Sequence, residues 1–325
     1  MNTSPQTQTT SQFAPAYSTE TNRTVIIGRQ DFFSILLRLI GMELYKIRRS
    51  PMSKVLGIIS ILAVLLLFLV VLFVTLVIVQ RGGSVSPSPL LPPLAFYLVT
   101  QVTLILGQVL MIILLGTLVG GEYGVGTIRL MLTRGPTRTQ FLLAKVGAAL
   151  VCAVLGASIM IVLGILLGFL FNLFTGLPFT LDFFTPAWLG HALLYILFTI
   201  FSLLVYSMLA LFLATLGHST AAGIASTLTW LLLGETILRT ILDVIGTATG
   251  GTAGDILRSV PDYFIGSNAG ALLQNQNQYL GFFGASSFSN PSSISNQHAI
   301  LVLLVYVAAF IGLSLWLNQK RDITN

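Results

Sequence analysis

Charged residues gather in one short stretch that lies between two long apolar segments of this sequence. The stretch reads GEYGVGTIRLMLTRGPTR and runs from Gly121 to Arg138, with an acid, Glu122, near its start. Only 8% of all residues are charged, so an acid and three arginines so close together are the first candidates for chemistry. Such residues could bind a partner protein, hold a phosphate or fix the topology of a membrane segment. The elements around them must decide between these roles.

The sequence lacks the common patterns of catalytic and metal-binding residues. It contains one cysteine, Cys152, and three scattered histidines, which excludes a disulfide framework and a cysteine-ligated zinc site. No His-Glu-x-x-His motif and no nucleophile elbow occurs. The glycines at 120, 121, 124 and 126 are followed by no Lys-Ser or Lys-Thr pair, so they do not form a phosphate-binding P-loop. We therefore expect no cofactor in this chain and no enzyme activity of its own.

The composition places most of the chain in lipid. Of 325 residues, 55% are hydrophobic, whereas a soluble domain carries roughly 25% charged residues to cover its surface. A membrane-spanning helix needs about 20 apolar residues. Six stretches qualify: Val55–Val79, Leu94–Val119, Val146–Phe171, Trp188–Leu216, Ala221–Ile245 and Ala299–Leu317. The sequence predicts an all-α integral membrane protein with six transmembrane helices. Since Gly217–Thr220 alone separates the fourth stretch from the fifth, the two form a tight helical hairpin or, alternatively, one long kinked helix.

The positions of the basic residues predict the orientation. Lysine and arginine concentrate before the first segment, between the second and third, and after the sixth, whereas acids dominate the other side. Cytoplasmic loops carry the excess of Lys and Arg, so we expect a multi-pass protein of the plasma (cell inner) membrane with both termini in the cytoplasm. The net charge of +6 follows from this topology and needs no nucleic-acid partner.

Three regions outside the spans have their own character. Residues 1–24 are rich in Ser, Thr and Gln, which predicts a disordered cytoplasmic tail. Residues 25–50 place Ser34, Arg38 and Tyr45 on one face of an otherwise apolar helix, which predicts an interfacial amphipathic helix or, alternatively, an extension of the first span. The remainder, residues 51–325, forms the transmembrane domain. Its long extracytoplasmic loop, 246–298, could hold a re-entrant or surface helix around Asp255–Leu273.

In the cytoplasm, the opening stretch reads as a small structural unit within a loop of residues 120–145. Gly120–Gly121 is expected to end the second span, and Thr127 can cap a short helix, Thr127–Arg134. The pair Gly135–Pro136 ends that helix, and Thr137 or Thr139 can cap the third span. Such a short amphipathic helix suits docking into a groove of another protein. The alternative is a loop whose arginines only fix topology.

The same stretch resembles the first cytoplasmic loop of the type-2 ATP-binding-cassette (ABC) exporter permeases, in which an acid, Gly-Thr, a basic residue, Pro, Arg and Lys mark the coupling helix. The matching residues are Glu122, Gly126, Thr127, Arg129, Pro136, Arg138 and Lys145. The resemblance extends to the six-span layout, the interfacial helix and the large outer loop before the sixth span. The N-terminal tail and the Asn/Gln-rich outer loop depart from the family's pattern.

The resemblance implies a permease subunit of an ATP-driven transporter, an exporter, that works as a homodimer or heterodimer. A separate ABC ATP-binding subunit would carry ATP and Mg. The coupling helix would transmit the nucleotide-driven movement of that subunit to the spans, which are embedded in membrane lipid. The residues expected to couple to that subunit are Glu122, Gly126, Thr127, Ile128, Arg129, Leu130, Arg134, Pro136 and Arg138.

Polar residues inside the spans allow two interpretations. Gln101 and Gln108 share a face of the second span, and Tyr195, Thr199, Ser202 and Tyr206 share a face of the fourth. They line a translocation path or, alternatively, form hydrogen bonds that hold helices together. On the fifth span, Glu235, Arg239 and Asp243 are spaced by four, which predicts mutual pairing near the outer end.

Two further classes of function compete with the permease. An ion-coupled secondary transporter would need acids at the membrane midplane and often inverted repeats, and the sequence shows no convincing repeat. An intramembrane enzyme would need a convergent base, nucleophile or metal set, for which the sequence offers no candidate.

Overall fold

The structure is a computed structural model that describes residues 32–83, 88–125, 137–179, 182–281 and 291–320. The described residues are helical, with turns and short connections and no strand between them. The elements are α1 (Phe32–Arg49), α2 (Pro51–Gln80), α3 (Leu94–Val125), α5 (Arg138–Asn172), α6 (Pro186–Gly217), α7 (Thr220–Thr229), a π-helical turn (Trp230–Gly234), α8 (Glu235–Thr249), α9 (Gly251–Ser259), a 3-10 turn (Val260–Tyr263), α10 (Ile265–Leu280) and α11 (Asn296–Lys320).

Five of these helices are long and apolar enough to cross a membrane: α2, α3, α5, α6 and α11. Each contains one of the predicted apolar stretches, so these five segments are confirmed as helices. In lipid a backbone must satisfy its own hydrogen bonds, which is why long apolar runs form uninterrupted helices. Local signals set several of the boundaries. Thr137 and Gln140 form a reciprocal capping box at the start of α5, as one of the two expected caps, and Thr185 caps α6 with Pro186 following.

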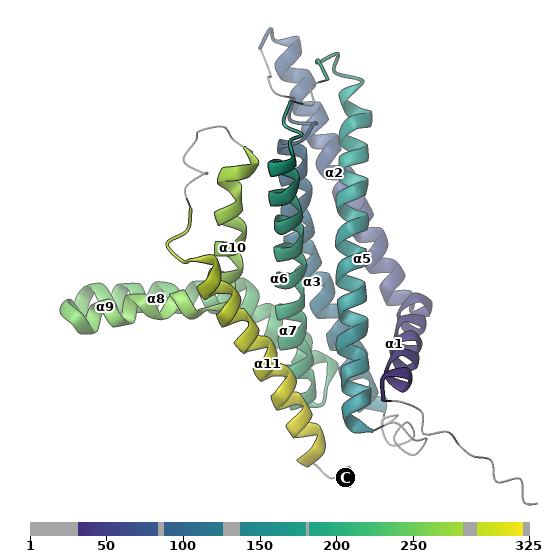
Figure 1. The fold of residues 1–325 in the computed structure, drawn as a ribbon, viewed down its shortest axis with the longest axis vertical. Coiled ribbons are helices and arrows are strands. Elements are labelled where there is room, and N and C mark those ends of the chain that lie inside the picture. Colours follow the sequence, from purple (N-terminus) through teal and green to yellow (C-terminus); the bar gives the residue numbers. More distant parts are fainter. Residues whose placement is uncertain (1–31, 84–87, 126–136, 180–181, 282–290, 321–325) are drawn as a thin grey trace, which may run out of the picture. The chain divides into compact units, whose positions relative to one another are not determined.

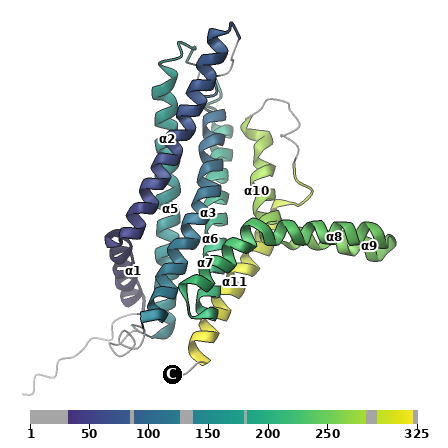
Figure 2. The same ribbon diagram turned by 180° about the vertical axis from the view of Figure 1, so that it is seen from behind.

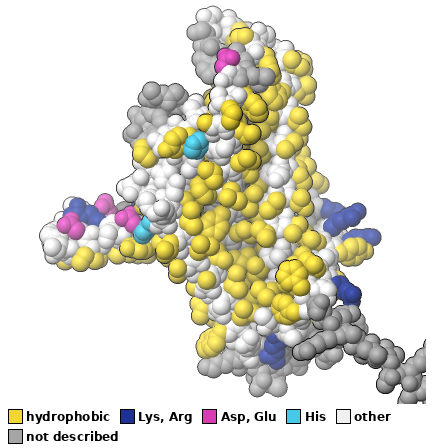
Figure 3. Space-filling view, in the orientation of Figure 1, with side chains coloured by type: hydrophobic (Ala, Val, Ile, Leu, Met, Phe, Trp, Pro, Cys, Tyr) yellow, Lys and Arg dark blue, Asp and Glu magenta, His cyan; other side chains and the backbone are white. Residues whose placement is uncertain are grey.

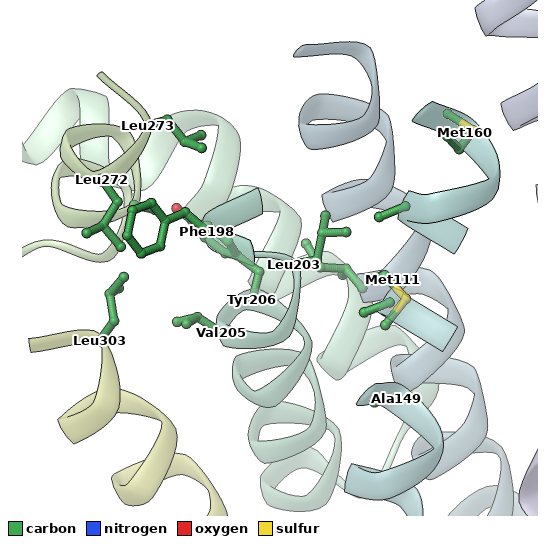
Figure 4. Packing of buried hydrophobic residues seen from close by; sticks show 14 of the residues in the cluster. Met111, Ala149, Met160, Phe198, Leu203, Val205, Tyr206, Leu272, Leu273 and Leu303 are labelled. Carbon is green, nitrogen blue, oxygen red and sulfur yellow. The ribbon is translucent and has the colours of Figure 1, made fainter. Parts of the chain in front are cut away.

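Helix α6 lies at the centre of the bundle, where it packs against α3, α5, α7, α10 and α11. Its most apolar stretch is 61% buried, against 17% for α2, so α2 turns most of its surface outward. Figure 4 shows how α6 joins its neighbours: Leu203 lies toward Met111 on α3, and Phe198 lies beside Leu272 on α10. Because outward-facing side chains on α2 and α5 are also apolar, the bundle has a hydrocarbon-like exterior (Figure 3).

The predicted hairpin between the fourth and fifth segments is present. His218 adopts a left-handed conformation, with φ at 49°, and Ser219 caps α7, which then packs against α6 and α3. The turn also lies against the end of α3. A Cβ atom added at Gly120 would lie 2.3 Å from the backbone nitrogen of Thr220, so only glycine allows this approach. The single kinked helix considered as an alternative is therefore excluded.

The expected fifth segment, Ala221–Ile245, is not one straight helix. The chain leaves α7 through the π-helical turn at Trp230–Gly234, and α8 then runs across the direction of the long helices (Figures 1 and 2). Helices α8 and α9 pack together as a hairpin that reverses at Gly250 and Gly251, both at positive φ. A π-helical turn is a known cause of a sharp bend. Neither half alone has the length of a membrane span.

The long loop 246–298 contains more structure than a single small helix. Its described residues form α9, the 3-10 turn and α10, and α10 packs against α6 and α11. The Asn/Gln-rich tract lies inside α10. Asn275 donates to Asn296 Oδ1 at 2.8 Å and to the Ile294 carbonyl, and Gln276 lies 2.8 Å from His191 on α6. These amides hold α10 to its neighbours.

Helix α1 lies before the first span and covers residues 32–49 of the segment 25–50; its predicted position in the membrane interface stays a prediction. Leu39 and Glu43 are buried, while Phe33 and Leu37 are exposed. Helix α1 packs mainly against α5, where Ile40 lies over Gly147 so closely that a Cβ atom there would displace the Ile40 side chain. The predicted tail, 1–24, lies outside the described residues.

Candidate functional site

Four charged side chains form a network at the end of α3 where the opening stretch of the sequence begins. Lys46 Nζ lies 3.0 Å from Glu43 Oε1 and 2.8 Å from Glu122 Oε1. Lys145 Nζ lies 2.7 Å from Glu122 Oε2 and 3.4 Å from Glu43 Oε1. The two acids and two bases alternate around a closed ring. We call these four residues the base cluster.

The base cluster is largely removed from water. The side chains of Lys145, Glu43 and Glu122 are 3%, 5% and 14% exposed, while that of Lys46 is 37% exposed. Lys145 also donates to the Leu118 carbonyl at 3.3 Å, and its ammonium lies over the Phe141 ring. Burial lowers the pKa of Lys46, but its hydrogen bond to Glu122 and the charges of Glu122 and Glu43 outweigh burial and raise that pKa above its usual value. The Lys46 ammonium is therefore stabilised by the two carboxylates beside it.

Three helices bring the base cluster together. On α1, Glu43 and Lys46 lie three residues apart and so share a face. Helix α3 continues through Gly120 and Gly121 to Val125, so the expectation that these glycines end the second span is wrong. Gly120 allows close packing instead, and the extra turn places Glu122 inside the bundle opposite α5. On α5, the cap at Thr137 begins the helix two turns before Lys145.

The remaining residues expected to couple to a partner lie mostly outside the described residues. Gly126, Thr127, Ile128, Arg129, Leu130, Arg134 and Pro136 all fall there, as does the predicted helix Thr127–Arg134. Arg138 is described, and its guanidinium donates to the Asn318 carbonyl at 2.9 Å near the end of α11. The described ends of this loop are thus fastened on both sides: Glu122 to α1 and α5, and Arg138 to α11.

The polar residues of the second and fourth spans pair with one another. Gln101 donates to the Tyr195 hydroxyl at 2.8 Å, and Gln108 donates to Ser202 Oγ at 2.9 Å. Thr199 bonds within its own helix, to the Tyr195 carbonyl. The two interhelical bonds are seven residues apart on both α3 and α6, which is about two helical turns. The bonds therefore connect matching positions along the two helices. This pairing is the arrangement expected of bonds that hold helices together.

Part of the same polar face also lines a large cleft. Gln108, Ser202 and Tyr206 border a cleft of about 1060 Å³ whose other walls come from α8, α10 and the segment before α11. Gln101, Tyr195 and Thr199 are not among its lining residues. Of the six residues predicted for a translocation path, three therefore reach a cavity.

The acid and base on α8 have other partners than those predicted. Glu235 accepts from the backbone N–H of Gly266 at 2.7 Å, from Trp230 Nε1 at 3.1 Å and from the Tyr206 hydroxyl at 3.4 Å. Arg239 donates to Ser267 Oγ. Glu235 and Arg239 thus hydrogen-bond to other groups, and no ion pair among Glu235, Arg239 and Asp243 occurs in the described part of the chain, although the charge of Arg239 still acts on Glu235. Glu235 lies at the N-terminus of α10, where a negative charge is favoured.

Sequence reasoning missed several of these residues. Glu43 is the lone acid of α1, one turn before Lys46, and that isolation within an apolar and basic helix was the available signal. Asn318 contributes only a carbonyl, and Gly266 only a backbone N–H, so neither could be recognised from its residue type.

The described part of the chain is helical, and its five apolar helices of membrane-spanning length indicate a multi-pass membrane protein. The chain belongs to the family described as "Protein of unknown function (DUF2705)", which matches residues 81–324. The matched region begins after α2 and includes Glu122, Lys145 and the cleft residues. No curated protein matches the chain.

Proposed function

We propose that the chain is the membrane-spanning permease subunit of an ATP-driven ABC exporter, with ATP bound and hydrolysed on a separate subunit. The observation that carries the proposal is the 2.7 Å contact between Glu122 and Lys145. These two residues are the first and last positions of the sequence pattern that resembles a coupling-helix loop. Their pairing joins the helix that enters the loop to the helix that leaves it.

The base cluster would connect the helix that enters this loop to the helix that leaves it. A force on a coupling helix at 127–134 reaches α3 and α5 directly, because both ends of the loop are fixed by buried ion pairs. Glu43 and Lys46 extend the connection to α1, and Arg138 extends it to α11. A partner that moves the loop would therefore move four helices together.

The arrangement of helices also supports the proposed six crossings. Lys46 meets Glu122, and Arg138 meets Asn318, so the start of α2 and the end of α11 lie at the same end of the bundle (Figure 1). A chain that starts and finishes on one side must cross an even number of times. Five helices have spanning length, and the sixth crossing would be composite: α7 with its π-helical turn rises part of the way, and α10 continues beyond the bend.

The experiment is affinity purification of the tagged chain from its native membrane in mild detergent, followed by mass spectrometry and an ATPase assay. We expect a stoichiometric ABC ATP-binding subunit whose hydrolysis responds to the permease. Arg129→Glu, Ile128→Ala and Leu130→Ala should each weaken that assembly roughly tenfold, the loss expected for about 1–2 kcal/mol of buried contact. Arg81→Glu, a charge reversal at the opposite end of α2, is the matched control.

Two outcomes would contradict the proposal. The first is a purified chain that hydrolyses ATP by itself after contaminating ATPases have been removed. The second is unchanged assembly and hydrolysis in all three loop variants at normal membrane levels, which would leave a loop that only fixes topology. The same purification reports on stoichiometry, and we expect two permease copies or one copy with a paralogue.

One observation favours a second candidate, an ion-coupled secondary transporter. Glu235 lies where a broken helix meets the N-terminus of another helix beside a large cleft, an arrangement that such transporters use for ion and substrate sites. Proteoliposomes distinguish the two: transport driven by an imposed proton or sodium gradient without ATP supports this alternative, and transport only with ATP supports the permease.

A further inference from the structure

A narrow apolar crevice lies between α2, α3 and α5, away from the cleft described above. Its volume is about 320 Å³, within the lower range of small-molecule pockets, roughly 300–1,000 Å³. The floor consists of buried side chains that include Met111, Leu203 and Met160, which Figure 4 shows near one another. The rim consists of exposed residues that include Gly57 and Ile159. The crevice therefore opens on the apolar outer face of the bundle.

A second cavity continues the crevice toward the junction of α1 and α2. It has a volume of about 230 Å³ and shares Ile47, Ser53 and Leu114 with the crevice, so the two adjoin, and we call them together the channel. Its lining is different in character, because it includes Lys46, Ser50 and Glu122. One end of the channel is thus aliphatic and the other end is polar. We call the two ends the tail crevice and the head cavity.

The head cavity contains groups that can donate hydrogen bonds. Glu122 is occupied by Lys46 and Lys145, so its charge is already balanced. An ammonium has three N–H donors, and the bonds of Lys46 to Glu43 and Glu122 use two of them. Ser50 precedes α2 without capping it through its side chain. The first turn of α2, with Met52 and Ser53 in the cavity wall, adds backbone N–H groups and a favourable dipole.

The surroundings of the head cavity are also basic. Arg48, Arg49 and Lys54 are exposed on the same short junction between α1 and α2. Juxtamembrane lysines and arginines attract anionic headgroups, each by about 1 kcal/mol near the surface. An aliphatic slot that opens to the outside of the bundle and ends at Lys46, close to these exposed basic residues, fits an amphiphile with a negative head.

We propose that this channel binds an anionic phospholipid, with one acyl chain in the tail crevice and the phosphate in the head cavity against Lys46 and the start of α2. The proposal goes beyond the proposed function and does not depend on it, because it invokes neither ATP nor a partner subunit. The lipid would lie beside the base cluster and contact α1, α2, α3 and α5 together. The lipid bound at this site would therefore affect the stability of the packing of α1 against the bundle.

The glycines of the rim provide a sharp test. A Cβ atom at Gly57 or Gly156 meets no atom within 4 Å, so Gly57→Leu and Gly156→Leu fill the tail crevice or its mouth without disturbing the backbone. Gly312 on α11 is the matched control, since its Cβ also meets no atom and it lines neither cavity. Each variant is placed in nanodiscs that contain phosphatidylglycerol with a photoactivatable diazirine on its acyl chain.

We expect cross-links to map to the lining segments of α2, α3 and α5 in the natural chain. Gly57→Leu and Gly156→Leu should reduce them about tenfold, the effect of displacing roughly two buried methylene groups, while Gly312→Leu leaves them unchanged. The same diazirine on phosphatidylcholine should label these segments less. Lys46→Gln should bring the two lipids to equal labelling, because the preference depends on the ammonium.

The chain's single cysteine gives an independent readout. Cys152 lines the tail crevice, so phosphatidylglycerol should slow its alkylation by a membrane-permeant maleimide relative to phosphatidylcholine. Equal labelling by the two lipids, or no difference between the crevice variants and Gly312→Leu, would overturn the proposal. Conversion of dimers to monomers in Gly156→Leu with unchanged lipid labelling would show that a second copy fills the crevice, and would overturn it as well.

Discussion

Lys145 Nζ lies 2.7 Å from Glu122 Oε2, and this contact joins the end of α3 to the beginning of α5 across the loop that separates them. Both residues are recognisable in the sequence as charges at the edges of apolar segments. In the structure they are inside the bundle, bonded in a ring with Glu43 and Lys46. The charges that resembled topology signals therefore connect helices.

Removal of the buried base should destabilise the bundle. Lys145→Met leaves Glu43 and Glu122 to share Lys46 as their remaining basic partner in the base cluster, and breaking a buried ion pair costs about 3–5 kcal/mol. We expect a lower midpoint of thermal unfolding in detergent. Size-exclusion chromatography after heating, or intrinsic fluorescence, measures this midpoint. The matched control is Lys54→Met, which removes an exposed charge from the start of α2.

The double variant Glu43→Leu/Lys145→Met should recover part of the loss, because the Lys46–Glu122 pair remains intact. Equal midpoints for Lys145→Met and Lys54→Met would show that the base cluster contributes no stability.

The hydrogen bonds between α3 and α6 should contribute small and independent increments. Tyr195→Phe removes the acceptor of Gln101, and Ser202→Ala removes that of Gln108, so each should cost about 0.6 kcal/mol. The two pairs share no partner, so the double variant should show the sum. Unfolding in a mixed-detergent titration measures these differences, with Thr199→Val as the control for a bond within one helix. If Ser202→Ala abolished transport at normal stability, the translocation path would become the better interpretation of this face.

Glu235 should hold the first turn of α10. Its carboxylate accepts from Gly266 N–H, so Glu235→Ala should cost about 1 kcal/mol at that helix end and speed amide exchange there. Hydrogen–deuterium exchange with mass spectrometry would follow peptides that cover residues 264–272. Asp243→Ala removes an exposed acid from the same helix α8 and should leave those peptides unchanged. If both variants accelerated amide exchange equally, the effect would come from the change in net charge and not from the Glu235–Gly266 hydrogen bond.

Cysteine labelling should report the orientation predicted from the basic residues. In a Cys152→Ala background, an exposed position beside the base cluster, Arg49→Cys, should resist an impermeant thiol reagent in intact cells. Asp255→Cys, on the exposed face of α9, should react, since its side chain is 74% exposed. Labelling of Arg49→Cys before membrane disruption would reverse the orientation, and with it the cytoplasmic position of the loop 120–145.

The sequence by itself determined the five long helices to within several residues at each end. Their apolar runs leave the backbone no partner except itself in lipid, so length and hydropathy are sufficient. It also located the α6–α7 hairpin, the cap at Thr137 and the polar faces of α3 and α6, because each depends on neighbours within a turn or two. These are local rules, and an apolar solvent enforces them strictly.

The tertiary structure decided which polar groups meet. The role of Gly120 inside α3 depends on the distant Thr220, which approaches too closely for any side chain at position 120. After the bend that follows α7, Glu235 accepts hydrogen bonds from Tyr206, Trp230 and Gly266, which lie on three different elements. Glu43 meets Lys145 only because α1 packs on α5. Such contacts depend on how each helix is rotated about its own axis relative to its neighbours. Because these helices are apolar on nearly every face, the hydrophobic pattern of the sequence does not determine that rotation.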